Sequence, residues 1–482
     1  VASFMAFSIW IGLGVYAFIN FITDSLLEKS IKLKSSYFMV ALFILFMPTR
    51  MLIANYHEHD RTGNYIAWDM AYNMLQTCEP NSILFTNGDN DTFPLWYLQE
   101  VEKIRTDVVV ANLSLLNTTW YIEQLRERYK ENPFIKMNDN EIRNLDFKRW
   151  ESKKISIKAP KDKNNEIGKI EWELNPTYLG VALRTQDLMV LRIINDNNWN
   201  RPIYFGVTVA PTSMLNLDNY LQMEGLAYRL VNNSNEVINQ NKISDNLLSF
   251  IGEKSWFNDY DSNKYNEVKR SISKNYQRGY IFRNLANEDV YVDPQLGRLV
   301  QNYRTGFVRL SISHYLDKDF QKAESVLLKM EEIMPSNIIP IPSKKLQYQI
   351  AQVYNGVGNQ AQMKYHMKEL VQRNDLELED YILYGKTFIQ LLEDYEESKL
   401  IFETIYQNYT FIEQSIIRRG FTATKISEKE WQDWQKSLPE IIYLLFLSYK
   451  NLEMYDEAKI LLTDWIKKNP ADDNAKELLD EI

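Results

Sequence analysis

The sequence predicts a multidomain protein of α/β and all-α parts. We expect two N-terminal transmembrane helices, a parallel-sheet α/β extracytoplasmic domain, and a C-terminal solenoid of paired helices. Three observations indicate this order: two long apolar runs near the N-terminus, β-branched segments alternating with amphipathic ones in the middle, and a last third of helical pattern. The expected boundaries are residues 1–56, 57–295 and 296–482.

The two N-terminal runs are residues 4–22, which carry no charge, and residues 37–56, which carry only Arg50. Each is long enough to cross a bilayer, and neither has the features of a signal peptide; the alternative is a pair of buried core helices. Three lysines lie between the runs and predict a cytoplasmic loop. We therefore expect an inner-membrane protein that has lost its upstream part, with residues 57–482 on the periplasmic side.

The middle of the chain contains three segments of buried-strand pattern, SILFT, TDVVVANLSLL and RPIYFGVTV. Amphipathic helical patterns precede, separate and follow them, which is typical of a parallel sheet. The segment KISIKAPKDKNNEIGKIEWEL predicts a hairpin with its tip at residues 161–165. The segment LDNYLQMEGLAYRLV predicts a helix over its first half.

Small residues and prolines recur at a fixed spacing in the last third. Ala323 precedes Pro335 by twelve residues, and Ala458 precedes Pro470 by the same interval. This spacing is typical of tetratricopeptide repeats, and two degenerate units lie between. The alternative is an ordinary helical bundle. A repeat solenoid would offer a concave groove to a protein acceptor or partner.

Composition limits the kinds of partner. The 482 residues carry a net charge of −9 and no basic stripe, so a nucleic-acid partner is not expected. Cys78 is the single cysteine, which excludes an intrachain disulfide and Cys/His zinc clusters.

A polar turn, NGDND, directly follows the first predicted strand. If the sheet is parallel, this turn lies at its carboxyl edge, where α/β proteins bind ligands. Its side chains could bind sugar hydroxyls, hold a divalent cation through oxygen, or only cap the helix expected to begin near Pro94, with Asp91 or Thr92 as the cap. The candidate ligand-binding residues here are Asn87, Asp89, Asn90 and Asp91.

A second polar cluster, HEHDR, spans residues 57–61 at the end of the second apolar run. Its two histidines could bind zinc from one face of an extended strand. The alternative is that these residues end the helix and cap the next one. Asp60 and Arg61 are further candidates for a functional polar contact, and the identity of any metal is open.

Several stretches together resemble a known family: HDRTGNYIAWDMAYNML, NSILFTNGDNDTFPLWYLQEVEKIRTDVVVANLSLLNTTWYI, NRPIYFGVTV, LDNYLQMEGLAYRLV and LVQNYRTGFVRL. They are similar to large bacterial membrane proteins of the protein O-mannosyltransferase-like class, which have a GT-C-type catalytic half, an extracytoplasmic α/β region and C-terminal tetratricopeptide repeats. Members often have D-x-H-D-R-S-G at the first motif. Here His57 replaces the first acid, which weakens a metal site at that motif.

The resemblance implies a glycosyltransferase-like membrane protein that uses a polyprenyl-phosphate-linked sugar. Its catalytic centre would lie in the absent N-terminal part, so this fragment is not expected to be catalytic alone, and no catalytic residue is assigned. The α/β and repeat regions would support recognition of the acceptor. Two alternatives remain: a membrane-anchored repeat scaffold without enzymatic activity, and a metal-dependent hydrolase that uses Asp89 and Asp91.

Overall fold

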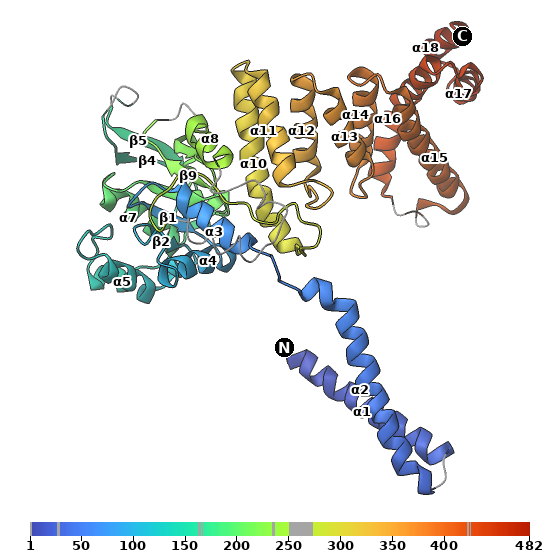
Figure 1. The fold of residues 1–482 in the computed structure, drawn as a ribbon. Coiled ribbons are helices and arrows are strands. Elements are labelled where there is room, and N and C mark those ends of the chain that lie inside the picture. Colours follow the sequence, from blue (N-terminus) through green and yellow to red (C-terminus); the bar gives the residue numbers. More distant parts are fainter. Residues whose placement is uncertain are drawn as a thin grey trace.

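The computed structural model describes residues 2–26, 29–161, 165, 167–233, 237–249, 273–421, 424 and 426–482. An N-terminal helical hairpin projects from the rest of the protein, in which an α/β part adjoins a row of paired helices (Figure 1). The hairpin consists of α1 (Ala2–Leu26) and α2 (Lys29–His59).

The expectation of two transmembrane helices is wrong. Among the residues that the structure describes, no helix combines the length and the apolar character needed to cross a membrane. In α2 the apolar run belongs to a longer helix, which starts at Lys29, contains Pro48 and Arg50, and ends in two histidines. The side of a membrane on which residues 57–482 lie stays a prediction.

The central sheet has five strands in the order β2-β1-β7-β9-β8. Leu84 of β1 pairs in parallel with Val110 of β2 and with Tyr204 of β7, so the three strands predicted from sequence form the parallel part. The last two strands pair antiparallel, which makes the sheet mixed instead of all parallel. The strands are β1 (Ile83–Thr86), β2 (Val109–Asn112), β7 (Ile203–Gly206), β8 (Leu221–Met223) and β9 (Ala227–Leu230).

Alternation along β1 divides its side chains between two cores. Leu84 packs in the core that contains Met74 and Leu95, whereas Ile83 and Phe85 pack in the core that contains Ile193. Because successive side chains of a strand point to opposite faces, this division places helices on both faces of the sheet. The predicted helices are confirmed as α3 (Ile66–Thr77), α4 (Asp89–Glu100), α5 (Thr119–Arg128) and α7 (Thr185–Asn197).

The helix expected within residues 217–231 is instead the β8–β9 hairpin, preceded by the short η3 (Asp218–Tyr220). Gly225 has φ of +135°, and a Cβ there would collide with the Tyr280 hydroxyl. Glycine therefore permits the reversal, and pairing of β9 with β7 overrides the local helical pattern. The other hairpin, predicted from residues 154–174, is confirmed as β4 (Lys153–Lys158) and β5 (Lys169–Leu174).

The remaining small elements connect the sheet. They are η1 (Leu115–Asn117), α6 (Asp139–Arg143), β3 (Lys148–Arg149), β6 (Ala182–Leu183), η2 (Pro211–Met214) and α8 (Gln240–Leu248).

Successive antiparallel helices fill the last third (Figure 1). Ala323 and Ala458 are fully buried, as expected for small residues where paired helices meet, but the tetratricopeptide identity of the array stays a prediction. Asn73 of α3 donates hydrogen bonds to the Ile281 carbonyl and the Tyr303 hydroxyl, so the α/β part and the array share a core. The helices are α10 (Pro294–Leu316), α11 (Phe320–Ile333), α12 (Lys344–Gly356), α13 (Gln360–Val371), α14 (Leu378–Gln390), α15 (Tyr395–Arg419), α16 (Glu428–Asn451), α17 (Tyr455–Lys468) and α18 (Asp473–Asp480).

Candidate functional site

The NGDND turn lies at the carboxyl end of β1, between the ends of β2 and β7. Helix α4 begins at Asp89, with Gly88 as the N-cap residue. The prediction that this helix begins near Pro94 is therefore wrong by one and a half turns. Pro94 lies inside the helix, in its second turn, where its missing N–H leaves the Asn90 carbonyl without the usual helical hydrogen bond.

Asp91 is a structural residue of this turn. Its Oδ1 accepts a hydrogen bond from the Gly88 amide at 3.0 Å, and its Oδ2 accepts one from the Asn87 amide at 3.2 Å. The Thr208 hydroxyl, which follows β7, donates to Oδ2 at 2.6 Å. A carboxylate at the start of a helix satisfies free amides and interacts favourably with the helix dipole. Both carboxylate oxygens are thus occupied by protein donors.

The Thr92 side chain links the turn to the ends of β1 and β2. Its buried hydroxyl lies 2.8 Å from the Thr86 hydroxyl and accepts a hydrogen bond from the Asn112 amide group at 2.8 Å. The Ser114 hydroxyl donates to the Asn87 carbonyl at 2.8 Å. Hydrogen bonds therefore join the segments at the ends of β1 and β2, and they fix the conformation of the turn.

Asp89 and Asn90 are the two candidates that remain available. Both are exposed in the first turn of α4, and their side chains have no hydrogen bond or ion pair with the residues that the structure describes. Within those residues there is also no group of three side chains suited to hold a metal ion. Because Asp91 is occupied, the turn does not present the pair of carboxylates that a metal-dependent hydrolase would use.

An apolar stripe continues from Asp89 along α4. Phe93, Tyr97 and Val101 follow at intervals of four residues and are 53%, 47% and 63% exposed. Side chains at this spacing lie on one face of a helix. We call the set Asp89, Asn90, Phe93, Tyr97 and Val101 the α4 face.

Aromatic ring contacts lead from the α4 face through the core to α5. The Phe93 ring lies 5.7 Å from that of Trp96, which lies 6.5 Å from that of Tyr121. Trp120, whose ring is 5.6 Å from Tyr121, is 55% exposed. An exposed apolar stripe such as that of the α4 face is typical of a surface that contacts a partner.

The residues of the HEHDR cluster stabilise the end of α2 through local contacts. Asp60 accepts a hydrogen bond from the Thr62 amide at 2.8 Å, and its hydrogen bonds from Thr62 lower the pKa of its carboxyl. The Arg61 guanidinium lies 5.7 Å from the Tyr291 ring, which the His57 ring meets edge-on at 5.5 Å. The structure shows no hydrogen bond or ion pair from Asp60 or Arg61 to the NGDND turn, so the two candidate groups are not brought together in its described part.

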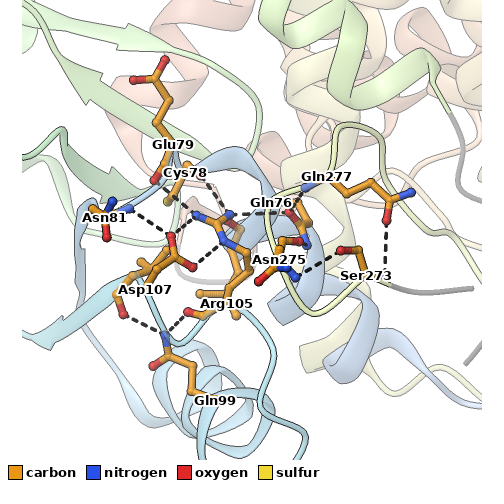
Figure 2. Close-up of polar contacts among 12 residues, drawn as sticks. Gln76, Cys78, Glu79, Asn81, Gln99, Arg105, Asp107, Ser273, Asn275 and Gln277 are labelled. Atoms are coloured by element: carbon orange, nitrogen blue, oxygen red, sulfur yellow. Dashed lines mark hydrogen bonds and ion pairs between the residues drawn. The ribbon is translucent and has the colours of Figure 1, made fainter. Parts of the chain in front are cut away.

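A buried arginine beside the central sheet was not predicted from the sequence. Figure 2 shows the Arg105 guanidinium within a ring of polar groups from three parts of the chain. It donates to the carbonyls of Cys78 and Glu79, at 2.9 and 3.2 Å, and forms an ion pair with Asp107 at 2.9 Å. These carbonyls follow α3, so Arg105 caps the carboxyl end of that helix. The only signal was two opposite charges two residues apart, directly before an apolar strand.

Glu224 and Arg229 were also missed, because their segment was assigned to a helix. The signal was a charged residue on either side of GLAY, within an otherwise apolar stretch. Glu224 is completely buried, and the Tyr204 hydroxyl donates to it at 2.8 Å.

A comparison with known protein families matches this same region. A family model described as TMEM260-associated domain 2 matches residues 67–148 and 144–247. Protein O-mannosyl-transferase tmem260 of Dictyostelium discoideum is 26% identical over 122 residues, 24% of this chain and 15% of that relative. No solved structure matches. The chain is thus similar to an O-mannosyltransferase-like family: the family model matches its α/β part, and the similarity to the Dictyostelium protein spans a small share of that relative.

Proposed function

We propose that this protein acts in protein O-glycosylation, and that its α4 face binds the acceptor polypeptide of a glycosyltransferase-like protein. Two findings support the proposal. The match to the TMEM260-associated domain includes all of α4, and the similar Dictyostelium protein is named as a protein O-mannosyl-transferase.

The proposal rests on one observation: the two aspartates of the turn have different roles. Asp91 holds the turn together, while Asp89 stays exposed at the head of the stripe formed by Phe93, Tyr97 and Val101. A polypeptide segment on the stripe would bury apolar area, and a Ser or Thr hydroxyl of that segment could donate to the Asp89 carboxylate. Asn90 offers both a donor and an acceptor to the backbone of the segment.

The helical array supplies a second surface for the same acceptor. A cleft of about 550 Å³ lies between α10 and α12, and one of about 750 Å³ lies between α8 and α10. Arg309 and Ile312 line both clefts, so the two clefts adjoin along α10, and we call the pair the α10 groove. We propose that the acceptor extends into this groove, and that the sugar comes from a polyprenyl-phosphate-linked donor. Neither the transfer step nor the donor is assigned to residues of this chain.

A partner-binding scaffold without glycosylation would use the same groove, and a cellular experiment separates the two functions. Cells that lack the gene are complemented with the wild type or with the variant Phe93→Ser/Tyr97→Ser, and protein-linked hexose is quantified by mass spectrometry. We expect the variant to restore several-fold less hexose than the wild type. The control is Leu400→Ser, which removes a 59% exposed leucine from α15, and it should restore the wild-type amount.

Two results would reject the proposal. If wild-type complementation changes no protein-linked hexose, the protein does not act in glycosylation and the scaffold is favoured. If the double variant glycosylates as well as the control, the α4 face is not the acceptor site.

A further inference from the structure

The α10 groove is positively charged on the side that faces α12, although the whole chain has a net charge of −9. Helix α10 lies between α8 and α12 (Figure 1). Its lining residues Thr305, Arg309 and Ile312 follow one another at intervals of four and three positions, which places them on one face of the helix. Between α10 and α12 the described lining includes two cations, Arg309 and Lys345, and no carboxylate.

Arg309 has part of its guanidinium available to a ligand. Its Nη1 lies 3.4 Å from the Tyr228 hydroxyl and 3.6 Å from the Met223 sulfur. Neither its Nε nor its Nη2 has a hydrogen bond with the residues that the structure describes, and neither atom is fully buried. These two N–H groups lie along one edge of the planar guanidinium, and that edge matches the two oxygens of a carboxylate.

Lys345 is the second cation without a carboxylate partner. The other lysines of α11, α12, α13 and α14 all form ion pairs. One of them is the adjacent Lys344, which pairs with Asp380 and does not line the groove. Lys345 is exposed in the groove and has no ion pair with the described residues. The side facing α12 thus presents two uncompensated positive charges.

The carboxylate that does line the described groove lies in its other cleft, between α8 and α10. It belongs to Asp317, whose Oδ2 accepts a hydrogen bond from the Gln240 side chain at 2.9 Å. Asp317 follows Arg309 by eight positions, which is about 12 Å along a helix. Over that distance the interaction between solvent-exposed charges is largely screened, so Asp317 does not neutralise the two cations.

The neutral lining residues suit an extended polypeptide. Thr305 and Gln349 offer donors and acceptors to peptide groups, and Ile312 and Leu346 offer apolar surface to side chains. A phosphate group would also be attracted by the two cations, but it would leave this apolar and amide-bearing surface unused.

We propose that the α10 groove binds an extended acidic polypeptide segment, with carboxylates of the segment on Arg309 and Lys345. The inference rests on the proposed function and specifies its acceptor: the part of the acceptor that reaches the groove carries Asp or Glu.

The test is equilibrium binding of peptides to the whole chain, measured by fluorescence anisotropy. The probe is a fluorescein-labelled peptide that repeats Glu-Val-Thr, and the matched control repeats Gln-Val-Thr. We expect the Glu peptide to bind at least about tenfold more tightly, the usual effect of hydrogen bonds to charged groups, and to weaken as the salt concentration rises. Inorganic phosphate should not displace it at constant ionic strength. Equal affinity of the two peptides, absence of binding, or displacement by phosphate would overturn the inference.

A matched pair of variants locates the bound peptide. Lys345→Glu should weaken binding of the Glu peptide at least about tenfold. Lys459→Glu makes the same charge change at an exposed position of α17, outside the groove, and should leave the affinity unchanged. If Lys345→Glu fails to fold, Arg309→Gln replaces it, with the same expected loss. Wild-type affinity in the folded groove variant, or an equal loss in Lys459→Glu, would overturn the inference.

Peptide binding and cellular glycosylation are separate measurements, so the two proposals can fail independently. If the wild type restores protein-linked hexose but binds the Glu and Gln peptides equally, only the acidic preference is rejected. If it binds the Glu peptide through Lys345 but restores no hexose, the proposed function is rejected and the groove remains a site for acidic polypeptides.

Discussion

The Asp91 carboxylate accepts a 2.6 Å hydrogen bond from the hydroxyl of Thr208, a residue 117 positions later in the chain. This bond joins the turn after β1 to the end of β7. Asp89, two residues earlier, has no such bond in the described structure and stays exposed. The two carboxylates of one short turn therefore differ in role: one stabilises the sheet edge and the other is available to a ligand.

Replacing Asp91 with Asn should reduce the free energy of unfolding by about 1–3 kcal/mol, because four donors lose a charged acceptor. Replacing Asp89 with Asn should change it by less than about 0.5 kcal/mol, as is usual for exposed side chains. Urea titration monitored by tryptophan fluorescence measures both. Equal losses in the two variants would show that Asp89 is also a structural residue.

Replacing the buried Arg105 with Met should reduce the free energy of unfolding by about 3–5 kcal/mol. The substitution leaves the Asp107 carboxylate without its ion-pair partner and the carbonyls after α3 without donors. Arg128→Met is the control: it breaks an ion pair with Glu100 in which both side chains are about half exposed, and such pairs contribute about 0–1 kcal/mol. Similar losses in the two variants would contradict the capping role of Arg105.

The stability of the helical array should depend on pH through Glu331 of α11. Burial raises the pKa of this carboxyl from 4.5 to about 7. Between pH 4.5 and 7 the folded state keeps a proton that the unfolded state has released, so its contribution to stability falls as the pH rises. Relative to Glu331→Gln, the wild type should lose about 3 kcal/mol across this range.

Comparison of the wild type with Glu331→Gln separates the titration of the Glu331 carboxyl from that of His366. The His366 Nε2 lies 3.5 Å from the Glu331 carboxylate, and burial, with the charge of Arg304, lowers the pKa of His366 to about 4. Both proteins in the comparison retain His366, so its own titration largely cancels. Thermal unfolding at several pH values is the measurement. A difference between the two proteins that does not vary with pH would contradict the prediction.

Much of the α/β part could be predicted because its signals are local. The three parallel strands are short apolar runs, and the place of the NGDND turn at their carboxyl edge follows from the strand–helix order. The roles of Asp89 and Asp91 could not be separated, because the decisive partner, Thr208, is distant in sequence. The β8–β9 hairpin was missed for the same reason: its pairing with β7 is non-local.

The two N-terminal helices show that apolar composition predicts a helix but not the length of that helix. The apolar runs predicted helices correctly, yet α2 extends well beyond its run and includes Pro48, Arg50 and two terminal histidines. The buried ion cluster around Glu224 was not predicted. Its charged residues are visible within an apolar stretch, but which of them form ion pairs depends on how distant segments pack.

The central claim is that the α4 face contacts an acceptor polypeptide, and site-specific photo-crosslinking in cells tests it most directly. A photoreactive phenylalanine analogue replaces Tyr97, which is 47% exposed on α4, or Ile460, which is 64% exposed on α17 and serves as the control. After irradiation, crosslinked partners are identified by mass spectrometry. We expect the Tyr97 position to capture proteins that carry O-linked hexose and the Ile460 position not to capture them. Capture of the same proteins at both positions, or of none at Tyr97, would contradict it.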